Sequence, residues 1–165
     1  MENEVNIPVQ NIEPKKFGGW LILIGIGIVI SPLRIIQLLT FTHVPIFTDG
    51  TWEVLTTVGS EAYSPLWGPI LSIEITINIL LLASSIYLIY LFFKKKKIFC
   101  NVYAYLAIFT SIFILADSWA VTLVIPEMKI FDAETIKEFG RSLIACIIWV
   151  PYMFISERAK ETFIK

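Results

Sequence analysis

The stretch GIVISPLRIIQLL, residues 27–39, is apolar except near its middle, where a proline and an arginine interrupt it. It lies within an apolar run at about 18–41, and about 20 such residues are enough for a helix to cross a bilayer. An isolated charge at the bilayer centre costs at least about 2.5–3.5 kcal/mol on insertion scales. Arg34 therefore predicts two things together: a membrane-spanning helix, and polar partners that shelter its guanidinium from hydrocarbon.

Three further segments are long and apolar enough to cross a membrane. The four predicted spans cover about 18–41, 66–93, 98–125 and 139–156, with outer loops at about 42–65 and 126–138. Of the 165 residues, 56% are hydrophobic and only 16% are charged, against about 25% charged in ordinary soluble domains. The sequence predicts an all-α integral membrane protein, a four-transmembrane-helix bundle that forms a single domain over residues 1–165.

Lysines and arginines predict the orientation of the helices, because short, positively charged loops stay in the cytoplasm. Lys94, Lys95, Lys96 and Lys97 separate the second and third spans, and basic residues also flank both ends of the chain. Between Arg34 and the first of these lysines there is no lysine or arginine. Both termini are therefore expected in the cytoplasm. The four lysines serve first as this topology signal; contact with anionic lipids, worth about 1 kcal/mol for each lysine, is the weaker interpretation.

The first outer loop combines turn signals with apolar residues. A short amphipathic helix around Trp52–Thr57 and a small hairpin fit this pattern equally well. The loop also holds His43, the only histidine of the chain, with no metal ligands near it in the sequence. Because a metal site needs several ligands that converge, we predict a solvated histidine at the membrane interface and no metal site.

Four charged side chains fall within the predicted spans, one in each. At 1.5 Å per helical residue, Arg34 and Glu74 lie roughly 10 Å inside the outer boundary, and Asp117 lies roughly 13 Å inside it. Arg141 stands near the outer start of the fourth span. The two acids balance the two bases, and arginine binds carboxylates through two parallel hydrogen bonds. We therefore predict that Arg34 faces the interior of the bundle and pairs with Asp117 or Glu74.

Further polar residues follow the same helical faces at spacings of three, four or seven residues. Pro32 and Pro151 each remove a backbone hydrogen bond and so open space for polar side chains or water. Two interpretations stay open at equal weight: an ion-pair network that holds the helices in register, and a ligand, ion or proton site open to the outer side. The candidates for ligand or ion binding are Arg34, Gln37, Glu74, Asn78, Asp117 and Arg141.

No pattern typical of catalysis is present in the sequence. It has no His/Cys metal spacing, no Gly-x-Ser-x-Gly nucleophile elbow and no glycine-rich phosphate loop. Cys100 and Cys146 lie in apolar runs without the spacing of a zinc or disulfide site. The net charge of −1 excludes a strong electrostatic case for nucleic-acid binding. We therefore predict no enzyme, no cofactor and no nucleic-acid partner.

Three stretches are similar to a bacterial inner-membrane family, the domain-of-unknown-function family 2569. They are GGWL at 18–21, SPLR at 31–34 and WVPYMFISERAKETF at 149–163, and the last is the most specific. The resemblance implies a small four-helix integral protein of the bacterial inner membrane and no particular activity. The middle of the chain resembles the family only in hydropathy and span count, so Glu74 and Asp117 gain no support from it.

Two functions compete on these grounds. The first is a binding or transport-related membrane protein, in which the polar cluster lines a cavity open to the outer side. A single four-span chain is small for alternating access, so transport would need a homodimer or a membrane-protein partner. The second is an accessory or structural membrane subunit, in which the cluster is an ion-pair staple and the chain docks onto another complex.

Overall fold

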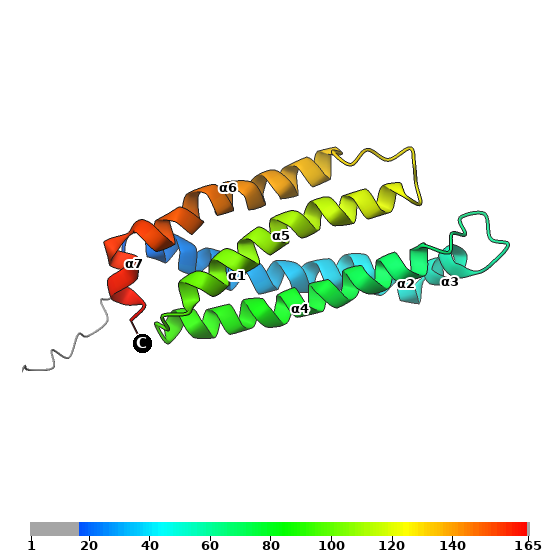
Figure 1. The fold of residues 1–165 in the computed structure, drawn as a ribbon. Helices are drawn as coiled ribbons and strands as arrows, with labels where there is room; N and C mark the ends of the chain where they lie inside the picture. Colours follow the sequence, from blue (N-terminus) through cyan, green and yellow to red (C-terminus); the bar gives the residue numbers. More distant parts are fainter. Residues whose placement is uncertain (1–16, 165) are drawn as a thin grey trace, which may run out of the picture.

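The computed structural model describes residues 17–164, and helices are the only regular elements within them. Four helical runs are long and apolar enough to cross a membrane. The prediction of an all-helical chain with four such runs is therefore confirmed. Figure 1 shows the four runs lying alongside one another, with short connections at both ends. The elements are α1 (Trp20–Leu38), the π-helical turn η1 (Leu39–His43), α2 (Val44–Thr48), α3 (Thr51–Thr56), α4 (Trp67–Phe93), α5 (Phe99–Thr122), α6 (Ala133–Ile155) and α7 (Glu157–Thr162).

The first membrane-spanning run is longer than the sequence predicted. α1 continues through η1 and α2 to give 29 residues, Trp20–Thr48, where we expected an end at Phe41. Pro45 does not stop the run, because it stands in the first turn of α2, a position that favours proline. Arg34 therefore lies at the midpoint of the run, roughly 20 Å from either end at 1.5 Å per residue, and deeper than expected.

The loop after this run contains a short helix, one of the two alternatives that we expected. α3 covers Thr51–Thr56, close to the helix expected at Trp52–Thr57, and the hairpin alternative is wrong. Gly50 precedes α3 with a φ of 85°, a left-handed conformation that favours glycine and that turns the chain after α2. α4 then begins at Trp67, close to the expected start of the second span.

The fourth long helix begins earlier than predicted. α6 starts at Ala133 and not at about residue 139, because the side chain of Asp132 caps it by accepting a hydrogen bond from the backbone N–H of Thr135 at 2.7 Å. Hydropathy alone misses such a start, since the first turns of the helix are charged. The consequence is that Glu138, which we expected in a loop, belongs to a membrane-spanning helix.

The buried core lies at one end of the molecule, where Lys94–Lys97 connect α4 to α5; we call this the lysine-turn end, and the opposite end the loop end. Aromatic rings dominate it: the ring centroids of Phe17 and Phe92 are 4.6 Å apart, and those of Phe99 and Phe163 are 4.4 Å apart. Figure 1 shows α7 folding across this end of the long helices. The core residues are Leu21, Ile24, Ile28, Leu88, Leu91, Phe92, Phe99, Met153, Ala159 and Phe163.

The four long helices form an open arc. α1 packs against α4, α4 against α5, and α5 against α6, whereas α1 and α6 share at most a weak contact. The contact between α1 and α6 that the structure records is at the lysine-turn end, where the ring centroids of Trp20 and Trp149 are 5.9 Å apart. Toward the loop end the α1–α4 pair separates from the α5–α6 pair (Figure 1).

Residues of the GGWL and WVPYMFISERAKETF stretches, far apart in the chain, meet at the lysine-turn end. A Cβ atom added at Gly18 would lie 3.2 Å from Nη1 of Arg158, and one added at Gly19 would lie 3.1 Å from the same atom. The two glycines therefore leave the room that the Arg158 guanidinium occupies. This packing holds the start of α1 against α7.

Candidate functional site

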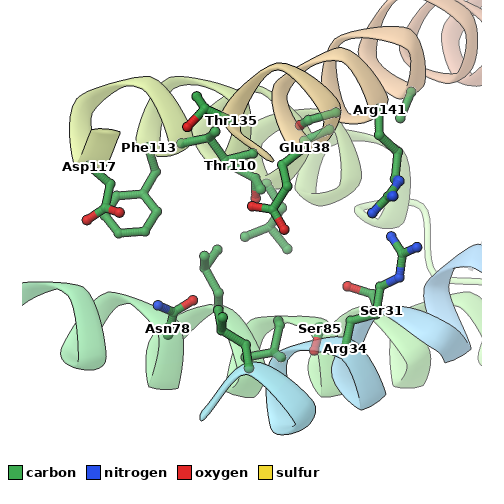
Figure 2. A pocket seen from close by; sticks show the side chains of 18 of the residues that line it. Ser31, Arg34, Asn78, Ser85, Thr110, Phe113, Asp117, Thr135, Glu138 and Arg141 are labelled. Carbon is green, nitrogen blue, oxygen red and sulfur yellow. The ribbon is translucent and has the colours of Figure 1, made fainter. Parts of the chain in front are cut away.

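A cavity of about 600 Å³ lies between the four long helices, where the two helix pairs separate. Ligand pockets are typically about 300–1,000 Å³, so this cavity is large enough for a small molecule or for part of a lipid. Figure 2 shows polar side chains from both pairs pointing into it. The charged residues that line it are Arg34, Glu74, Asp117, Lys129, Asp132, Glu138 and Arg141.

The cavity brings together five of the six candidates from the sequence: Arg34, Glu74, Asn78, Asp117 and Arg141. The sixth, Gln37, is exposed and does not line it. The side of α1 that faces the cavity carries Ser31, Arg34, Ile35 and Leu38, at spacings of three and four residues, and Gln37 stands to one side of that face.

Arg34 and Arg141 face each other across the cavity. Figure 2 shows the two guanidiniums pointing toward one another, one from α1 and one from α6. Within residues 17–164, neither side chain makes a hydrogen bond or an ion pair. The expected pairing of Arg34 with Glu74 or Asp117 is therefore wrong, because Arg34 lies deeper than expected and Glu74 has another partner.

That partner is His43. Its Nε2 lies 2.9 Å from Oε1 of Glu74, its Nδ1 lies 3.4 Å from the carbonyl oxygen of Leu38, and its side chain is only 4% exposed. The prediction of a solvated interfacial histidine is therefore wrong.

Helical periodicity does not predict this pair, because nine residues, about two and a half turns of an α-helix, separate His43 from Arg34. In a regular helix the two residues would face opposite sides. The π-helical turn Leu39–His43 changes this register, since each of its turns takes in an additional residue. The ring of His43 consequently turns toward α4.

The His43–Glu74 contact joins η1 to α4. Nε2 of His43 and Oε1 of Glu74 are at hydrogen-bond distance, 2.9 Å apart, although the two residues are 31 positions apart in the chain. The contact therefore gives Glu74 a partner other than the arginines of the cavity.

Acidic residues gather toward the loop end of the cavity. Asp117 interacts electrostatically with Glu74, His43 and Glu138. In Figure 2, Asp117 and the two arginines lie at opposite sides of the cavity, and Glu138 points its carboxylate into the space between them. The cavity is therefore electrostatically polarised: apart from Lys129, the charged residues toward the loop end are acids, and the two guanidiniums lie deeper inside.

Hydroxyl groups join α5 to α6 along one side of the cavity, and sequence reasoning missed them. Ser111 Oγ lies 2.7 Å from Ser142 Oγ and 3.3 Å from Sγ of Cys146. Ser118 Oγ donates to the Ile130 carbonyl at 2.7 Å, which ties the loop before α6 to α5. These bonds hold the α5–α6 pair together as one wall of the cavity.

Metal ligands are not grouped in residues 17–164: no cluster of three or more His, Cys, Asp or Glu side chains there is able to hold an ion. Cys100 and Cys146 are both free. The charges that line the cavity, above all the two guanidiniums, are suited instead to binding an organic or inorganic anion by hydrogen bonds.

Comparison with known proteins gives one result. Residues 14–164 match the model of a family described as "Protein of unknown function (DUF2569)". No curated protein and no solved structure matches the chain.

Proposed function

The chain belongs to the DUF2569 family of proteins of unknown function, and we propose that it is a non-enzymatic membrane protein that binds an anionic group between Arg34 and Arg141. The match covers all four membrane-spanning runs, so the residues that line the cavity lie within the matched part of the chain. Five of the candidate residues line that cavity.

One observation carries the proposal: two guanidiniums point at each other inside the cavity without a carboxylate partner among residues 17–164. Each charge costs at least about 2.5–3.5 kcal/mol to place at the centre of a bilayer, and two like charges also repel each other. An anion between them offsets both costs. The planar guanidinium fork suits carboxylate and phosphate groups, which it binds through paired hydrogen bonds.

The ion-pair staple, the competing interpretation of the cluster, would need each arginine of the cavity to be bonded to an acid. Within residues 17–164, the ion pair recorded for a cavity-lining acid joins Glu74 to His43, which is not part of the cavity lining, and it involves neither arginine. A binding role is therefore favoured over a purely structural one. We place the lysine-turn end in the cytoplasm of a bacterial inner membrane, as the lysine distribution predicts, so that the cavity opens toward the outer side.

The test compares the unfolding temperature of the wild type with that of Arg34→Met and Arg141→Met in maltoside detergent. Without added anion, each variant should be more stable than the wild type, because it removes one of two repelling charges. A staple predicts the opposite sign, since removing either arginine would leave its acid partner without a counter-charge. Gln37→Met, on the same helix but outside the cavity, is the matched control and should leave the stability unchanged.

The second part of the test adds two probes, inorganic phosphate and hexadecyl phosphate. At least one should raise the unfolding temperature of the wild type, by an amount that corresponds to about 2.7 kcal/mol at 100 times its Kd. The Arg34→Met and Arg141→Met variants should bind the same probe at least ten-fold more weakly. Loss of stability in both variants without probe, or equal binding by the wild type and Arg34→Met, would overturn the proposal.

A further inference from the structure

We propose that the anion is the phosphate of a membrane lipid with an amino-phosphate headgroup, and that this lipid enters the cavity sideways between α1 and α6. This inference rests on the anion site proposed above and names its ligand class and its route of entry.

The route follows from the open arc of helices. Near the lysine-turn end, Trp20 and Trp149 bring α1 and α6 together. Beyond that contact α1 and α6 do not pack against each other. The pairs α1–α4, α4–α5 and α5–α6 all pack. Gly27, which lines the cavity from α1, faces open space: a Cβ atom added there would meet no atom within 4 Å. In a bilayer, this side of the cavity is open to lipid.

The walls of the cavity are amphipathic along its length. Toward the lysine-turn end they carry Leu23 and Ile24 of α1 and Trp149 of α6, whereas Arg34 and Arg141 lie nearer the loop end. An apolar surface in this place suits an acyl chain, and the guanidiniums suit the phosphate to which such a chain is linked. A small, fully polar anion would leave the apolar part of the cavity unfilled.

The acids explain why the headgroup should also carry an amine. Glu138 and Asp117 lie on the loop-end side of the two guanidiniums (Figure 2). A headgroup with phosphate alone would meet these carboxylates with like charge. An ammonium group beyond the phosphate would instead lie among them, so that a zwitterionic headgroup matches both halves of the cavity.

The experiment is native mass spectrometry of the full chain in maltoside detergent, with phosphatidylethanolamine, phosphatidylglycerol and water-soluble phosphoethanolamine as probes. Two variants isolate the route of entry. Gly27→Trp places a ring in the gap between α1 and α6. Ile26→Trp, its matched control, places the same ring one residue away, where the side chain is 51% exposed and outside the cavity. Gly27→Leu replaces Gly27→Trp if the larger ring prevents folding.

We expect phosphatidylethanolamine to bind at least ten-fold more tightly than phosphatidylglycerol, and excess phosphoethanolamine not to displace it. Gly27→Trp should lose this binding, and Ile26→Trp should keep it. Equal binding of both lipids would overturn the amino-phosphate headgroup, and unchanged binding by Gly27→Trp would overturn the lateral route.

Two outcomes distinguish a wrong lipid ligand from a wrong anion site. If phosphoethanolamine binds the wild type as well as the lipid does, and Arg34→Met loses that binding, the ligand is water-soluble and only the lipid inference fails. If no probe binds and Arg34→Met behaves like the wild type with each of them, both proposals fail.

Discussion

The two ends of the molecule are built from the same four helices and differ in almost every physical respect. At the lysine-turn end, Phe92 is 3% exposed and Phe99 is fully buried, and the two rings meet edge to face within a cluster of aromatic side chains. At the loop end the helix pairs separate around a cavity of about 600 Å³ lined by charged side chains. The difference indicates a division of roles: one end holds the helices together, which leaves the other end free to carry charges without ion-pair partners among residues 17–164, such as Arg34 and Arg141. Binding regions are commonly found in the less stable parts of a protein.

Replacing one buried ring should give the largest contrast between the two ends. Phe99→Ala removes a ring at the centre of the lysine-turn core and should cost about 3 kcal/mol of unfolding free energy. Phe113→Ala removes the same ring from the wall of the cavity, where it is only half-buried, and should cost less than about 1 kcal/mol. Unfolding by sodium dodecyl sulfate, followed by circular dichroism, measures both. Equal losses would mean that the two ends contribute equally to stability.

Two glycines of α1 give a finer contrast, because they are only two residues apart. A Cβ atom at Gly25 would lie 3.0 Å from the ring of Phe92, which is itself held in the ring cluster, whereas one at Gly27 would meet nothing. Gly25→Leu should therefore destabilise the protein by about 2 kcal/mol through overpacking. Gly27→Leu should leave it unchanged or raise its stability by up to about 1 kcal/mol, as glycine disfavours helix.

Thermal unfolding in maltoside detergent, under the same conditions for both glycine variants, provides the measurement. A similar loss in the two variants would show that α1 is packed equally on both sides, which contradicts an open cavity beside Gly27.

The sequence predicted the features that depend on composition and regular spacing. Four apolar runs required four long helices, and the depth of Arg34, Glu74 and Asp117 along them was enough to predict that they share one interior region. It did not predict which of them are paired, because pairing depends on the relative depth and rotation of the helices. The end of the first run lies at Thr48 and not at Phe41, and this difference changes the depth of Arg34 by roughly 10 Å at 1.5 Å per residue.

Two local devices lie beyond hydropathy. A π-helical turn rotates His43 toward Glu74. The residue preferences of its sequence, LTFTH at Leu39–His43, do not predict such a turn. The Asp132 cap, by contrast, had a recognisable signal: an N-cap residue followed by helix-forming residues. This signal predicts a fourth helix that includes Glu138. The prediction would add one more charged residue to the cavity wall.

The contact between His43 and Glu74 should contribute a modest coupling energy to the stability of the loop end. A double-mutant cycle with His43→Ala and Glu74→Ala isolates it, because the two residues are 2.9 Å apart and come from different helices. We expect a coupling of about 1 kcal/mol, in the range of polar contacts between membrane helices. Detergent unfolding of the four proteins measures it. A coupling near zero would show that the contact does not tie η1 to α4.

The smallest expected effect is a pH dependence confined to the loop end. The backbone and side chain of Thr135 hold the pKa of Asp132 below its ordinary value of 3.8. Because the folded protein binds this proton less readily than the unfolded chain, the cap contributes stability above about pH 3.8 and loses it as the pH falls through the lowered pKa. The first turn of α6 should then fray, while the ring cluster at the other end, which contains no acid, should not respond.

Nuclear magnetic resonance of the Asp132 carboxyl and the Thr135 amide during an acid titration tests this contrast. Asp49 would titrate in the same pH range, because its hydrogen bonds with Thr51 also lower the pKa of its carboxyl group. An Asp49→Asn background therefore removes a second titration from the same pH range. In that background Asp132→Asn keeps an acceptor for the cap but has no charge to lose, so its first turn should no longer respond to acid. A response that persists in Asp132→Asn would assign the transition to the other acids that line the cavity, and the loop end would then titrate through these acids rather than through the helix cap.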